Sequence, residues 1–157
     1  MNLVVHTEYV ANTTPERIFA VLADGWTYSD WVVGTAHIRD VDPDWPAPGT
    51  AIHHKAGPWP FSLRDTTVAI DCQPPRMLLL APKLWPLGAA QVRIVLTPVG
   101  AGRATRIELT EDVAEGPLHW FRTRVNDLAL HWRNKESLRR LADLAVHRTS
   151  TVREHTA

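Results

Sequence analysis

The C-terminal part of the chain is the feature that most restricts its possible folds. After Pro117 no Gly or Pro interrupts the sequence up to Val146, so one long helix is possible there. One set of positions recurs at spacings of four, four, three and four residues: Leu130, Asn134, Leu138, Leu141 and Ala145. These spacings predict an amphipathic helix that must bury one face against another part of the protein.

The remaining positions of this helix divide into a charged side and a second apolar stripe. The charged side is expected to face solvent and carries Arg133, Glu136, Arg140 and Asp143. The second stripe consists of Leu118, Phe121, Val125, Leu128 and Trp132, so the segment before about Asp127 does not continue the first stripe. Either a separate turn therefore precedes the helix, or the helix bends.

The N-terminal region predicts a strand followed by short helices. Leu3–Val10 is rich in Val, Thr and Tyr, which favours a strand. Thr14 can cap a helix whose first position is Pro15, because proline lacks the N–H that would have no partner there. The aromatic segment Trp26–Val33 is long enough for one or two further helical turns.

Between these regions, Pro and Gly separate a series of short segments with alternating polarity. Strands are predicted over Thr35–Val41, Thr50–Lys55, Phe61–Cys72, Arg76–Ala81, Ala89–Pro98 and Arg103–Val113. Such spacing is typical of an antiparallel meander, with one face solvated and one face apolar. We therefore predict an α+β fold in which a curved antiparallel sheet of about seven strands wraps around the C-terminal helix. A pocket is expected wherever the helix does not fill the concave face of the sheet.

Composition limits the class of protein further. The 157 residues contain 17 Lys plus Arg and 17 Asp plus Glu, so no overall basic character favours nucleic acid. The longest apolar run is the six residues Ile18–Ala23, far below the ~20 that span a membrane. The single Cys72 fits a reducing, cytoplasmic location. We expect one domain over residues 1–146, a polar tail over 147–157, and a monomer or homodimer.

Five segments of the sequence resemble the START-like, or helix-grip, superfamily, and within it the bacterial polyketide cyclase/dehydrase-like (SRPBCC) group. They are Asn12–Asp24 (NTTPERIFAVLAD), Trp31–Gly34 (WVVG), Val41–His54 (VDPDWPAPGTAIHH), Trp85–Gly88 (WPLG) and Arg133–Ala145 (RNKESLRRLADLA). The resemblance covers nearly the whole chain up to about Val146. It implies a hydrophobic cavity between the sheet and the C-terminal helix. It implies no particular reaction, because this fold hosts transport, sensing and catalysis.

Four polar residues are candidates to enter that cavity. Adjacent residues of a strand point to opposite faces, so only one of His53 and His54 faces inward, and Ile52 and Ala56 favour His54. By the same alternation, Arg64 and Glu111 are expected in the cavity, and Asn134 is expected there because it lies on the buried stripe of the C-terminal helix. Arg64 would supply the positive charge that a buried Glu111 needs. The four form either a structural network or a ligand site, unless a β-bulge redirects some of them.

Four tryptophans are candidates to line the cavity mouth, because an indole offers a large apolar area and one donor. They are Trp31, Trp59, Trp85 and Trp132. The alternative is that they pack in the core. The sequence shows no phosphate-binding loop, dinucleotide fingerprint, zinc-protease motif or cysteine pair, so we predict no cofactor and no metal.

Two functions follow from these features. The first is binding or transport of a small hydrophobic molecule such as a lipid, a polyketide or an aromatic metabolite. The second is a cyclase or dehydratase activity in which His54, Arg64 and Glu111 provide acid–base catalysis and stabilise an oxyanion. Because no catalytic signature is present, binding is favoured. A homodimer formed through exposed tryptophans is a third possibility.

Overall fold

A computed structural model describes residues 3–56, 63–84, 88–115 and 124–154. Its elements, in chain order, are β1 (Leu3–Ala11), α1 (Pro15–Leu22), the 3-10 turn η1 (Gly25–Thr27), α2 (Tyr28–Trp31), β2 (Thr35–Val41), β3 (Ala51–Ala56), β4 (Leu63–Gln73), β5 (Met77–Leu84), β6 (Gly88–Val99), β7 (Ala104–Glu115) and α3 (Arg124–Glu154). The predicted strand–helix–strands–helix order is confirmed. Helix α3 continues to Glu154, through most of the segment that the sequence predicts as a polar tail.

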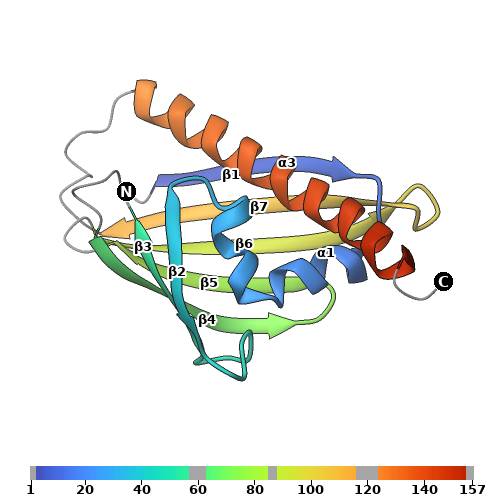
Figure 1. The fold of residues 1–157 in the computed structure, drawn as a ribbon. Helices are drawn as coiled ribbons and strands as arrows, with labels where there is room; N and C mark the ends of the chain where they lie inside the picture. Colours follow the sequence, from blue (N-terminus) through green and yellow to red (C-terminus); the bar gives the residue numbers. More distant parts are fainter. Residues whose placement is uncertain (1–2, 57–62, 85–87, 116–123, 155–157) are drawn as a thin grey trace.

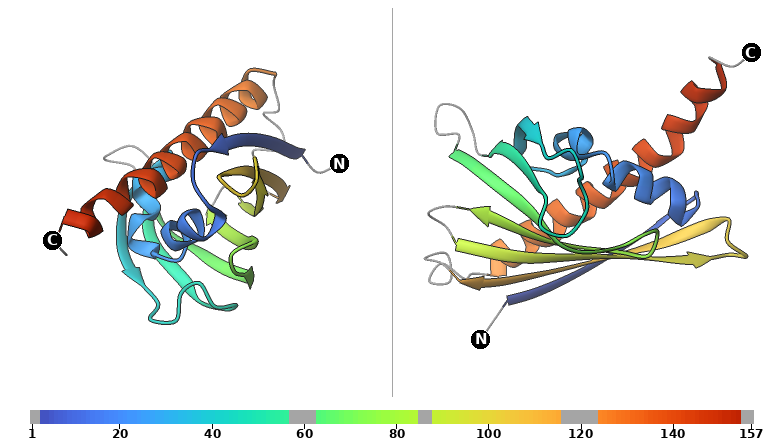
Figure 2. Two further views of the ribbon diagram at one scale, coloured as in Figure 1. Left: turned by 90° about the vertical axis from the view of Figure 1, so that its right-hand side faces the viewer. Right: turned by 90° about the horizontal axis from the view of Figure 1, so that it is seen from below.

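The strands form one antiparallel sheet with the order β1-β7-β6-β5-β4-β3-β2. Consecutive strands from β2 to β7 are neighbours, as in a meander, whereas β1 joins the far edge beside β7 (Figure 1). Helix α3 packs against β1, α1 and α2 and crosses the sheet obliquely (Figure 2). This is the predicted α+β helix-grip fold.

The short helices between β1 and β2 are held tightly against the sheet. Thr14 occupies the capping position before Pro15, but its side chain makes no capping hydrogen bond. At η1, a Cβ on Gly25 would lie 2.7 Å from Cγ1 of Val41, so this packing needs a residue without a side chain. The indole N–H of the buried Trp45 donates to the carbonyl of Leu22 at 3.1 Å. These contacts fix the segment that borders the pocket described below.

The predicted stripe of α3 is buried from Asn134 onward, whereas its first member, Leu130, is partly exposed. Asn134, Leu138, Leu141 and Ala145 are all under 5% exposed. The second stripe of the sequence faces solvent instead, since Leu128 is 70% and Trp132 is 66% exposed. No helix among the described residues is long and apolar enough to cross a membrane.

Strand β4 departs from the predicted alternation. Three of its side chains are buried on the inner face: Asp65, Thr67 and Ala69. Arg64 and Ile70 are exposed, so the prediction that Arg64 enters the cavity is wrong. The pairing with β5 shifts between Ala69 and Asp71, and after this shift Cys72 packs against the core. An irregularity of this kind reverses the faces of the residues on either side of it, so the apolar character of Ile70 and Cys72 indicated the wrong face for Arg64.

Candidate functional site

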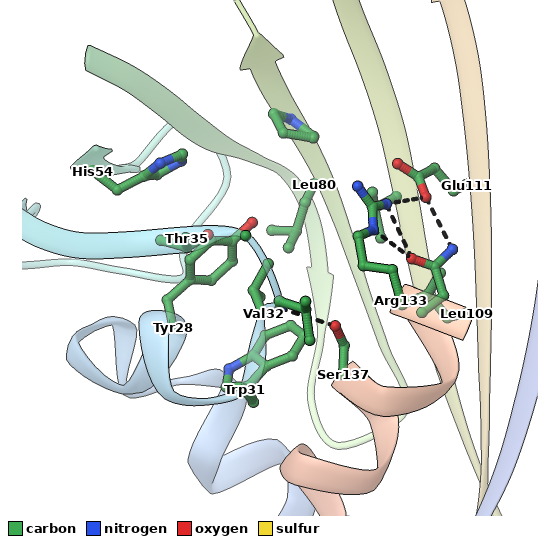
Figure 3. A pocket seen from close by; sticks show the side chains of 15 residues that line it. Tyr28, Trp31, Val32, Thr35, His54, Leu80, Leu109, Glu111, Arg133 and Ser137 are labelled. Carbon is green, nitrogen blue, oxygen red and sulfur yellow. Dashed lines mark hydrogen bonds and ion pairs between the residues drawn. The ribbon is translucent and has the colours of Figure 1, made fainter. Parts of the chain in front are cut away.

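A pocket lies between the sheet, the α2–β2 segment and helix α3, where the sequence predicts a cavity. Its volume is about 140 Å³ and it is partly open. The walls are mainly apolar and include Trp31, Val32, Leu80, Val92 and Leu109. Polar side chains lie on two sides of this apolar surface, with His54 on one side and Glu111 on the other (Figure 3).

The polar group beside α3 is a closed triangle of hydrogen bonds. Arg133 Nη2 lies 2.6 Å from Glu111 Oε2, and Asn134 Nδ2 donates to the same oxygen at 2.9 Å. Arg133 Nη2 also donates to Asn134 Oδ1 at 3.0 Å. The Glu111 side chain is only 6% exposed, so the cation and the amide together compensate for burial of its charge.

Arg133 therefore has the role that was predicted for Arg64, the pairing of the buried Glu111. The helical period places Arg133 on the charged side of α3, and we expected it to face solvent. Its side chain is instead half-buried, at 35% exposure, and lines the pocket. A long guanidinium side chain can keep its Cα at the border of a helix face and still bring its charge over the buried stripe. In the sequence, the only indication that Arg133 reaches the pocket is that it directly precedes Asn134, a polar residue on the buried stripe.

His54 belongs to a second polar group, on the other side of the pocket. Its Nε2 lies 3.0 Å from Thr67 Oγ1, and the Tyr28 hydroxyl lies 3.3 Å from the same oxygen. The imidazole stacks on Tyr28 with ring centroids 5.6 Å apart, and Tyr28 packs edge-on against Trp31 at 5.4 Å. Tyr28 and Thr67 were not predicted as site residues. Neither the short helix α2 nor the irregular strand β4 shows a clear hydrophobic periodicity in the sequence.

Burial controls the protonation of this group. Removal from water, with a smaller contribution from the neighbouring His53, lowers the pKa of His54 from 6.5 to about 4. Burial also raises the pKa of the Tyr28 hydroxyl. Both rings are therefore neutral near pH 7. As predicted, His53 points to the other face, where its Nε2 lies 3.3 Å from Asp42 Oδ1.

We expect His54 to make folding stability depend on pH. Between pH 6.5 and 4 the imidazole is protonated in the unfolded chain but not in the folded one, so stability falls as the pH falls through this range. The pKa difference corresponds to at most about 3 kcal/mol, and water admitted by the partly open pocket reduces this to roughly 2 kcal/mol. Urea unfolding at several pH values measures the loss.

The matched variant for this measurement is His54→Gln. Its side-chain amide can still hydrogen-bond to Thr67, but it has no group that titrates in this pH range. Asp65, directly opposite His54 in the β3–β4 register, and Tyr28, stacked on it, remain in both proteins and contribute equally. The variant should show a shallower fall in stability between pH 6.5 and 4. Equal slopes for the two proteins would show that His54 is not responsible.

The structure brings together some of the predicted site residues but not others. Trp31, His54, Glu111 and Asn134 line the pocket, and their contact with a ligand stays a prediction. Trp132 is exposed on α3 and is not among the residues that line the pocket, so its predicted placement there is wrong. The reason is that it lies on the second apolar stripe, which faces solvent. Trp59 and Trp85 lie outside the described residues.

Ser137 is a further pocket residue that sequence reasoning missed. Its hydroxyl accepts a hydrogen bond of 3.1 Å from the backbone N–H of Val33. This bond connects α3 to the segment after α2, so one pocket wall is held to the other (Figure 3). Ser137 lies one turn after Arg133, on the pocket side of the helix. The available signal was a serine directly beside the buried stripe, three residues after Asn134 and one before Leu138.

Outside the pocket, one group of described side chains has a spacing that suits a metal ion. His6, Glu8 and Glu108 lie on β1 and β7 with their ligand atoms within 4.8 Å of one another. The three are wholly or partly exposed, and His6 pairs with Glu8 at 3.1 Å. An exposed histidine between two carboxylates is explained by this pairing alone, so the group does not indicate a metal centre.

The curved sheet, the C-terminal helix and the pocket between them define a helix-grip domain. A family model described as "Polyketide cyclase / dehydrase and lipid transport" matches residues 2–146, and the chain belongs to this family. No curated protein sequence matches the chain. The family and the fold together support, in general terms, hydrophobic-ligand binding or a polyketide cyclase-type activity.

Solved structures share the fold at low sequence identity. The Zhui aromatase/cyclase from Streptomyces sp. R1128 has a TM-score of 0.70 at 15% identity, over 95% of this chain and 96% of that one. Ara h 8.0201 has a TM-score of 0.69 at 10% identity, over 93% and 99%. Protein NE0264 from Nitrosomonas europaea has a TM-score of 0.70 at 16% identity, over 94% and 97%. At such identities the likeness concerns the fold alone.

Proposed function

We propose that this protein binds a small, mainly hydrophobic molecule in the pocket between its sheet and helix α3. The observation that carries the proposal is the pocket itself, which combines apolar walls with polar groups at two sides. Pockets of this composition are the usual sites for small organic ligands, because burial of apolar area provides affinity and the few polar groups provide orientation. Family membership supports the same class of ligand.

A cyclase- or dehydratase-type enzyme is the second candidate. It is favoured by the neutral His54, which has a nitrogen free to exchange a proton, and by the family description. Acid–base chemistry of this type needs at least two polar groups that converge on one reacting atom. His54 and Glu111 instead belong to separate hydrogen-bond networks on different sides of the pocket (Figure 3). Binding without chemistry is therefore the stronger proposal.

Filling the pocket from one wall tests this function. Val92 lines the pocket from β6, so Val92→Phe should occupy space that a ligand needs. We expect toluene binding, followed by ¹H–¹⁵N NMR titration, to weaken by about 10-fold or more. Native mass spectrometry of the protein as isolated should also show a bound small molecule that the variant lacks.

The matched control is Val95→Phe on the same strand. Val95 lies three positions after Val92, and because side chains alternate between the two faces, it points to the outer face of the sheet. Its toluene affinity should equal that of the unchanged protein. Binding that is absent from the unchanged protein, or lost equally in both variants, would contradict ligand binding in this pocket.

A further inference from the structure

One ring nitrogen of His54, a residue that lines the pocket, has no hydrogen-bond partner among the described residues. His54 is only 2% exposed, and its Nδ1 makes no hydrogen bond to the part of the chain that the structure describes. The other buried side-chain atoms in this condition belong to Thr7, Thr13 and Asp112, none of which lines the pocket. A buried nitrogen without a partner is unfavourable. A ligand atom that satisfies it therefore gains free energy that a purely apolar ligand does not.

The hydrogen bonds from His54 Nε2 to Thr67, and from Thr67 to Tyr28, allow His54 Nδ1 to act as either donor or acceptor. If the Tyr28 hydroxyl donates to Thr67, and Thr67 donates to Nε2, then the single proton of the neutral imidazole is on Nδ1. If both bonds reverse, Nε2–H donates to Thr67 and Nδ1 presents a lone pair. Rotation of two hydroxyl hydrogens and a change of tautomer interconvert these arrangements. The group thus offers a hydrogen bond to a carbonyl or to a hydroxyl.

The size of the pocket restricts the part of a ligand that fits. Its volume of about 140 Å³ is close to that of an engineered cavity of about 150 Å³ that binds benzene. One six-membered ring therefore fills it, with Trp31, Leu80 and Leu109 among the apolar walls. A folded chain of several rings would extend beyond this volume through the open side of the pocket.

The charges of the pocket disfavour an anionic ligand. Arg133 is the one cation among the described lining residues, and it is already paired with Glu111 at 2.6 Å. A ligand carboxylate would approach a second carboxylate that is almost completely buried. Since like charges at close range in a poorly solvated site repel strongly, a neutral oxygen is preferred.

We propose that the pocket selects a neutral ring that carries a hydroxyl or carbonyl oxygen, which hydrogen-bonds to His54 Nδ1. This inference rests on the proposed ligand-binding function and specifies the chemistry of the ligand. His54 is then a specificity-determining residue. Thr67 and Tyr28 are positioning residues, which act through it.

Pairs of probes that differ by one oxygen test the proposal. Phenol against benzene, and cyclohexanone against cyclohexane, are titrated by NMR and calorimetry. One additional neutral hydrogen bond should favour the oxygen-bearing member of each pair by about 5-fold. Benzoate should bind more weakly than phenol. In protein with ¹⁵N-labelled histidine, phenol should shift the Nδ1 resonance of His54 toward the acceptor form and cyclohexanone toward the protonated form.

Two variants locate the effect. His54→Phe keeps a flat ring against Tyr28 but removes both nitrogens, and it should abolish the ~5-fold preference while benzene still binds. His53→Phe changes the adjacent residue on the opposite face and should keep the preference. The ¹⁵N measurement in the unchanged protein decides the question if His54→Phe does not fold.

The possible failures are distinguishable. If benzene binds but phenol shows no preference and no Nδ1 shift, the hydrogen-bond proposal is overturned and ligand binding in the pocket stands. Benzoate binding more tightly than phenol would overturn the preference for a neutral group. If none of the probes perturbs the pocket resonances, the proposed function fails as well.

Discussion

Replacing Leu141 by alanine should lower the free energy of unfolding by about 3–4 kcal/mol. Leu141 is 0% exposed on the inner face of α3, where the helix closes the core. The truncation removes apolar contacts and leaves a cavity, because the close-packed neighbours relax only in part. Denaturant unfolding followed by circular dichroism measures the change.

The same helix provides a matched control. Leu128 lies on the second apolar stripe and is 70% exposed, so Leu128→Ala removes the same atoms from water-accessible surface. It should change stability by less than about 0.5 kcal/mol. Similar losses for the two substitutions would mean that α3 is not held to the sheet by the face described here.

Breaking the ion pair beside the pocket should have the second large effect. Arg133→Met leaves the Glu111 carboxylate buried with Asn134 as its one side-chain donor among the described residues. Removing one partner of a buried pair costs 3–5 kcal/mol, and we expect about 3 kcal/mol because the amide of Asn134 still donates. Thermal and urea unfolding at pH 7 measure this loss.

A double-mutant cycle separates the charge from the packing of the arginine stem. In a Glu111→Gln background no buried carboxylate remains beside Arg133, so Arg133→Met should cost under about 1 kcal/mol there. A surface pair between the same helix and the residue before η1 is the control: Arg148 lies 2.6 Å from Asp24, and Arg148→Met should cost at most about 1 kcal/mol. Equal costs of Arg133→Met in the two backgrounds would rule out the charge as the cause.

The regular elements of the fold were predictable because their hydrophobic periods are unbroken. Strand β7 pairs with β1 in continuous register, so alternation correctly placed Glu111 inward. The uninterrupted helix α3 likewise placed Asn134 on the buried face. In both cases a polar residue at a position that the pattern requires to be apolar was the informative signal.

Prediction failed where local geometry or side-chain length overrides the period. The shift in the β4 pairing between Ala69 and Asp71 puts Arg64 and Cys72 on opposite faces, and no residue pattern predicts such an irregularity. Arg133 reached the pocket from a helix position that the period assigns to the charged side. Tyr28 lies in a helix of four residues, which is too short to show a period at all.

The place of β1 in the sheet has a consequence for how the chain folds. The first strand pairs with the last, so that His6 and Thr110 make contact although they are 104 residues apart in sequence. Contacts of such long range close a large loop and slow the search for the native state. His54 comes from the first half of the chain, whereas Glu111 and Arg133 come from its last third. During synthesis, the two sides of the pocket therefore meet only after most of the polypeptide has left the ribosome.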